Sequence, residues 1–77
     1  MAHRTTIVLR DGTEVGRALL DVLPSSQDVI RIGDKSYKAY TVHAGKHTIY
    51  EVPPQGAGSA AVGYTESKII VDEIKNG

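Results

Sequence analysis

Basic and tyrosine side chains are concentrated in the middle of the chain, where they suit contact with nucleic acid. Residues 29–50 hold one acidic residue, four basic residues and three tyrosines, which are Arg31, Lys35, Lys38, Lys46, Tyr37, Tyr40 and Tyr50. Cationic groups neutralise phosphates, and exposed tyrosine rings stack on unpaired bases. The pattern predicts a surface for single-stranded nucleic acid. The chain has no Phe or Trp, however, so a core would compete for the same tyrosine rings.

Two histidines four residues apart, His43 and His47, suggest a metal site if a three-residue loop brings them face to face. No cysteine or carboxylate lies beside them in the sequence to complete a set of ligands. In the strand pairing that the pattern favours, the two rings fall on opposite faces. We therefore expect no metal and no cofactor, and we place both histidines in a binding surface with Arg31, Lys35, Tyr37, Lys38 and Lys46.

The other reactive groups are not arranged for catalysis. The serines lie mainly in segments with loop composition, and no nucleophile-elbow motif surrounds them. Residues 56–63 are rich in glycine but lack the Gly-Lys-Ser/Thr ending of a phosphate-binding loop. Asp72 and Glu73 are adjacent, so in a strand they point to opposite faces. The sequence predicts a protein that is not an enzyme.

Short strands must position these side chains. Residues 5–10 are rich in β-branched residues and end at Asp11-Gly12, a dipeptide typical of tight turns. Residues 13–23 fit a strand better than a helix, because Gly16 weakens a helix and the turn points back to a partner strand. A short helix over 14–23 is the alternative. Residues 29–32 form a further strand, which Gly33-Asp34 closes.

The second half of the chain predicts a hairpin, a loop and a last strand. Residues 37–42 and 48–52 pair across 43–46, with Tyr40 opposite Ile49. Residues 53–64 have no periodicity and hold two of the three prolines, so we expect a flexible Pro/Gly/Ala-rich loop. Residues 68–75 have the β-branched density of a strand.

These elements predict an all-β fold. Five or six short strands joined by tight turns indicate one small antiparallel barrel or roll over residues 1–77. The residues expected to be mostly buried are Ile7, Leu9, Leu20, Val22, Ile30, Ile32, Tyr40, Val42, Ile49 and Ile70.

The first hairpin also points to a type of barrel. The run Thr-Ile-Val-Leu-Arg-Asp-Gly-Thr-Glu-Val-Gly-Arg-Ala-Leu-Leu, within residues 5–20, resembles the opening hairpin of SH3-like and Sm-like small barrels. In those folds a strand, Asp-Gly and a bent second strand recur. The resemblance covers this segment only and implies a fold class, without any functional residue.

Composition limits the classes of function. Nine basic residues balance nine acidic ones, so net charge attracts neither nucleic acid nor membrane. Residues 1–50 nevertheless carry +2 and residues 51–77 carry −2. The absence of cysteine and of a long apolar stretch predicts a cytoplasmic protein that binds no membrane.

We expect a small non-catalytic protein-protein interaction module, a monomer or weak homodimer, whose partner is another protein. Arg17 and Tyr64 are candidate anchors, because Arg and Tyr often dominate binding energy. The alternative is a single-stranded nucleic-acid-binding β-barrel that uses the basic, tyrosine-containing hairpin 31–50.

Overall fold

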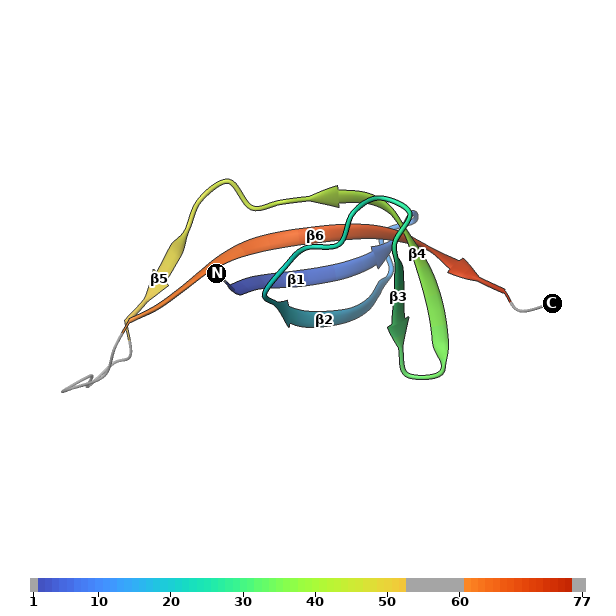
Figure 1. Ribbon diagram of the computed structural model, residues 1–77, viewed down its shortest axis with the longest axis horizontal. Helices are drawn as coiled ribbons and strands as arrows, with labels where there is room; N and C mark the ends of the chain where they lie inside the picture. The colour runs from blue at the N-terminus through green and yellow to red at the C-terminus, as the bar shows by residue number, and fades with distance from the viewer. Residues whose placement is uncertain (1, 53–60, 76–77) are drawn as a thin grey trace.

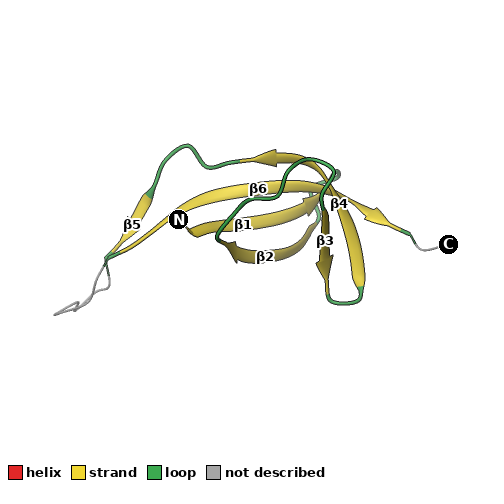
Figure 2. Ribbon diagram, in the orientation of Figure 1, coloured by secondary structure: helices red, strands yellow, loops and turns green. Residues whose placement is uncertain are grey.

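The computed structural model describes residues 2–52 and 61–75, which form six strands and no helix (Figures 1 and 2). The strands are β1 (Ala2–Leu9), β2 (Glu14–Leu20), β3 (Val29–Ile32), β4 (Lys35–His43), β5 (Ile49–Glu51) and β6 (Val62–Ile74). The predicted all-β class is confirmed, and β2 is a strand where a helix was the alternative. No helix that is long and apolar enough to span a membrane occurs in these two ranges.

Two glycine-containing turns close the first two predicted hairpins. Gly12 has φ 96° and Gly33 has φ 63°, a region that glycine enters without the steric cost of a Cβ. The amide of Gly12 donates to the Leu9 carbonyl at 2.9 Å, and the Asp11 carboxylate accepts the Thr13 amide at 2.9 Å. Gly33 and Asp34 alone join β3 to β4, as the sequence predicts.

Strand β6 is the centre of the sheet, whose order is β2-β1-β6-β4-β3. It runs parallel to β1, with Ile7 opposite Ile69, and antiparallel to β4 and β5. The parallel pair departs from the expected antiparallel sheet. Parallel pairing favours strands that are buried, and β1 and β6 supply the most deeply buried large aliphatic residues, Ile7, Ile69 and Val71.

The predicted hairpin between residues 37–42 and 48–52 is wrong, because β4 and β5 do not pair with each other. Both pair with β6, which is 13 residues long and offers one edge to β4 at residues 68–74 and to β5 at residues 62–64. Between them the Gly45 amide donates to the Ser67 hydroxyl at 3.0 Å. That bond places the connection between β4 and β5 alongside β6.

The sheet curls (Figure 1), and a cluster of buried side chains forms its core. Ile7, Tyr37, Ala39, Ile69 and Val71 form the buried cluster, and Leu9, Val15, Leu20, Ile30, Ile32 and Val42 pack against it while half-buried. Of the ten residues expected to be mostly buried, Ile7 is buried, and Leu9, Leu20, Ile30, Ile32, Val42 and Ile70 are half-buried.

Three predicted core residues, Val22, Tyr40 and Ile49, are instead exposed. Tyr40 stands at a break in the register between Ala39 and Thr41, which turns its ring outward to lie 3.8 Å from the Arg10 guanidinium carbon. Val22 lies in the connection after β2, and Ile49 lies in β5, away from the curled part of the sheet (Figure 1).

The predicted flexible loop at 53–64 falls mainly outside the described residues. Its last three residues, 62–64, belong to β6, so the final strand begins six residues before the expected position 68. The additional length is what allows β6 to pair with β5 as well as β4.

Candidate functional site

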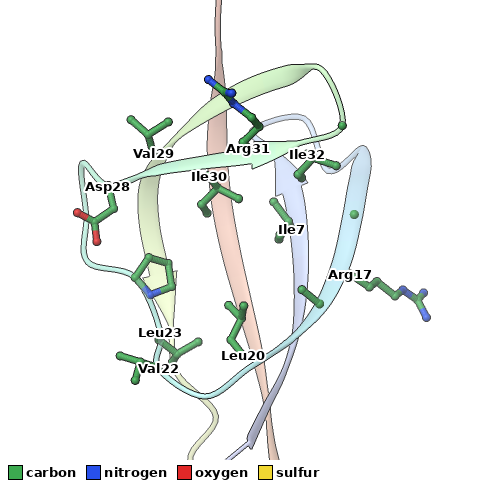
Figure 3. Close-up of a pocket in the computed structure, with 14 residues that line it drawn as sticks. Ile7, Arg17, Leu20, Val22, Leu23, Asp28, Val29, Ile30, Arg31 and Ile32 are labelled. Carbon is green, nitrogen blue, oxygen red and sulfur yellow. The ribbon is translucent and has the colours of Figure 1, made fainter.

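The two edge strands of the curled sheet, β2 and β3, face each other across an open groove of about 680 Å³ (Figure 3). No backbone ladder joins them, so each strand has one edge without a partner strand in the described part of the chain. Inward-facing side chains come from alternate positions of each strand, as the period of two requires. Ile7 and Leu20 lie on one side, and Ile30 and Ile32 on the other.

The groove is narrow at one end because β2 and β3 converge there. A Cβ built on Gly16 would lie 3.1 Å from Cδ1 of Ile32, so the absence of a side chain lets the two strands approach. Towards Leu20 and Ile30 the strands separate, and the connection that joins them passes around this end of the groove (Figure 3). The half-barrel is therefore open between its two edges.

Apolar residues of the connection 21–28 form the lip of the groove. Leu23 and Pro24 are half-buried there, and Val22 is 80% exposed. Hydrogen bonds attach the connection to β4: the Gln27 amide donates to the Ala39 carbonyl, and the Ala39 amide donates to the Asp28 carbonyl, each at 2.8 Å. The lip is thus a fixed apolar surface.

Three charged residues lie at the margin of the groove, and these are Arg17, Asp28 and Arg31. The Glu14 carboxylate bonds Arg17 through two nitrogens, at 3.0 and 3.1 Å, and these hydrogen bonds raise the pKa of Arg17. The Asp28 carboxylate accepts the Ser25 amide at 2.8 Å. Arg31 has no ion pair among the described residues and points away from the groove floor (Figure 3). Its charge is available to a bound acidic group.

A second surface, which we call the basic row, crosses the convex face of the sheet. Register places Arg17 beside Thr6, Thr6 beside Lys68, and Lys68 beside His43. The three basic side chains of this row are exposed. With the neighbouring Arg4 and Glu66 they line a shallow depression that can accept an anion.

A third histidine, His3, contacts buried hydroxyls on the concave face. Its Nδ1 lies 2.6 Å from the Thr65 Oγ1, which is 3.4 Å from the Ser67 Oγ. Thr65 and Ser67 are buried. No carboxylate contacts His3 within the described residues, so this cluster lacks the acid of a catalytic triad and serves to satisfy buried polar groups.

The structure disperses the seven predicted site residues. Arg31 borders the groove, whereas Lys35 and Lys38 are exposed along β4. Tyr37 is 5% exposed and belongs to the core, so it cannot stack on a base. The other three follow from the end of β4: His43 lies in the basic row, and Lys46 and His47 lie in the connection to β5.

Of the two proposed interface anchors, only Arg17 lies at a candidate surface. Tyr64 is 7% exposed, and its hydroxyl accepts a hydrogen bond from Arg4 at 3.3 Å. Arg4 also lies over the Tyr64 ring, 4.6 Å from its centroid. Tyr64 therefore cannot act as an exposed anchor.

Sequence reasoning did not find the groove, although one signal was present. Val22 and Leu23 stand directly before Pro24, at the end of the predicted strand 13–23, whereas β2 ends before them at Leu20. Apolar side chains in a connection are candidates for a contact surface. What the sequence does not reveal is that β2 and β3 become the two facing edges, because this depends on β6 pairing with β1.

Comparison with known proteins finds no relative: no family model matches the chain, and no curated protein and no solved structure matches it significantly.

Proposed function

We propose that this protein is a non-catalytic protein-binding module of the cytoplasm, which takes up an extended apolar segment of its partner between β2 and β3. The observation that carries the proposal is the groove itself, which is apolar and is bordered by two strand edges that have no partner strand among the described residues. An unpaired edge is a template for another strand. Peptides recognised by strand addition gain affinity from main-chain hydrogen bonds and specificity from pockets for alternate side chains.

The composition of the groove supports a peptide over a reacting substrate. Its only titratable residues are Arg17, Asp28 and Arg31, which include no nucleophile with an adjacent base. Apolar residues on the floor suit alternate apolar side chains of a strand. Arg31 points to the opposite side of β3 from Ile30 and Ile32 (Figure 3). It therefore suits an acidic residue of the peptide that lies between two inward-facing apolar residues.

A titration with designed peptides tests this function. The probe is an eight-residue peptide that alternates valine or tyrosine with polar residues and contains one glutamate. The control has the same sequence with N-methyl groups on alternate amides, which prevents ladder hydrogen bonds without removing side chains. We expect amide shift changes in β2 and β3, and binding about tenfold weaker for the control, the loss of about 1.4 kcal/mol. Equal affinity of the two peptides, or shift changes confined to the convex face, would contradict the proposal.

The basic row supports a second function, the binding of single-stranded nucleic acid. Arg17, Lys68 and His43 are aligned across four strands by register, and such a row can follow a phosphate backbone. This surface replaces the predicted hairpin 31–50, in which β4 and β5 do not pair with each other. Binding of a 15-residue oligothymidylate that weakens steeply with salt and is lost in Lys68→Glu, but kept in Lys75→Glu, would favour this function.

A further inference from the structure

Strand β5 and the start of β6 form an arm that extends beyond the curled part of the sheet (Figure 1). We define the arm as residues 49–52 and 61–64. The molecule measures 54 × 24 × 21 Å, and the radius of gyration, 14.7 Å, exceeds the roughly 11.5 Å of a compact domain of this length. A single chain therefore exposes a long, narrow projection.

Tyr64, at the base of the arm, lies beneath Arg4, whereas three other large apolar side chains of the arm are largely exposed. Tyr50 is 68% exposed, Val52 70% and Val62 59%. A Cβ on Gly63 would lie 2.9 Å from the Tyr50 ring, so glycine at this position lets the ring lie across the arm. Two-stranded ribbons are marginally stable alone. Because β5 pairs only with β6, its other edge has no partner strand in the described ranges.

The arm and the groove match in length, side-chain alternation and charge. Strand β3 presents four residues, Val29–Ile32, and the first part of the arm also has four, 49–52. If β5 is added beside β3 so that Tyr50 and Val52 lie next to Ile30 and Ile32, alternation places Glu51 beside Arg31 on the other face. This holds for either strand direction. Glu51, exposed and without an ion pair among described residues, then meets the unpaired cation.

We propose that the occupant of the groove is the arm of a second copy of this chain. This inference rests on the proposed function, since it names the partner segment for the same groove. A chain cannot fill its own groove, because its arm projects away from β3 (Figure 1). Because arm and groove are two different surfaces, two copies that exchange arms form a closed dimer. Copies that do not exchange arms reciprocally form a filament.

Charge reversal tests the pairing by sedimentation over a range of concentrations. Glu51→Arg and Arg31→Glu should each weaken self-association about tenfold, because each places like charges together. An equimolar mixture of the two variants should associate about as tightly as the wild type, since every arm then meets a groove of opposite charge. Recovery on mixing also shows that both variants are folded. Failure of the mixture to recover would overturn the inference.

Two further variants separate this inference from the proposed function. Tyr50→Ser should weaken association at least about tenfold, whereas Leu19→Ser, a matched loss of an exposed apolar side chain on the convex face, should leave it unchanged. The inference would be overturned, and the function left standing, if the wild-type chain binds the designed peptide but stays monomeric at about 1 mM. Self-association would then have a free energy weaker than about 4 kcal/mol, which corresponds to a Kd of about 1 mM. A chain that neither associates nor binds peptide would overturn both.

Discussion

Filling the groove with a side chain of the protein itself should stabilise the fold while blocking its binding. Ala18 is half-buried on β2, between Gly16 and Leu20 on the concave side, and lines the groove. The substitution Ala18→Phe places a ring in the open space. Covering about 100 Å² of the roughly 150–250 Å² that a buried aromatic provides is worth about 2.5 kcal/mol at about 25 cal/mol/Å². Fixing the side chain costs about 1 kcal/mol, so we expect a net gain of about 1.5 kcal/mol.

The assay pairs urea unfolding with peptide binding. Ala18→Phe should raise the unfolding midpoint without changing the slope and should weaken binding of the designed peptide at least about tenfold. Leu19→Phe is the matched control, because Leu19 is the next residue of β2, lies on the convex face and is 68% exposed. It should change neither quantity. A loss of more than about 1 kcal/mol in Ala18→Phe, the cost typical of an overpacked core, would refute the reasoning that the groove is open.

Three other outcomes follow from the described residues. Ile69→Ala, at a fully buried position, should lower the free energy of unfolding by about 2–5 kcal/mol. The total for a chain of this length is about 4–12 kcal/mol. An effect as small as that of Val62→Ala, at an exposed position, would contradict the core assignment. Both Gln27 and Gly33 have positive φ, where a side chain is strained. In urea unfolding, Gln27→Gly should therefore stabilise the fold and Gly33→Ala should destabilise it, each by about 1 kcal/mol. Effects of the opposite signs would disprove the backbone argument. The Thr13 amide donates to the Asp11 carboxylate and lowers its pKa. The stability that this group contributes is therefore present above its unfolded pKa of about 3.9 and is lost as pH falls through the folded pKa. A carboxyl NMR titration should place the pKa of Asp11 below 3.8, and a pKa at or above 3.8 would contradict the prediction.

Local signals predicted the local part of the fold. Asp11-Gly12 and Gly33-Asp34 specify turns through backbone conformations that glycine favours, so the hairpins on either side of them were predictable. Residues 13–23 fit a strand better than a helix, and residues 14–20 of this segment form β2. In each case the information lies within about ten residues of the feature that it determines.

Long-range pairing was not predictable from those signals. The alternating pattern of residues 37–52 is compatible with a hairpin and also with pairing of both segments to a third strand. The structure has the second arrangement, because β6 is long enough to pair with both β4 and β5. The same competition determines the candidate site. Once β1 and β6 occupy the centre, β2 and β3 become edges, and their inward side chains line a groove. Tyr37 becomes core for the same reason, since β4 lies beside β6.

Hydrogen exchange of the backbone amides in β3 tests the central claim most directly. Those β3 amides that do not donate to β4 face an open edge, and in the chain without a partner they should exchange quickly. On saturation with the designed peptide, or at concentrations where the chain self-associates, the account predicts that they become protected by a ladder with the added strand. Unchanged exchange at β3 and β2, together with proven binding of the peptide, would contradict it.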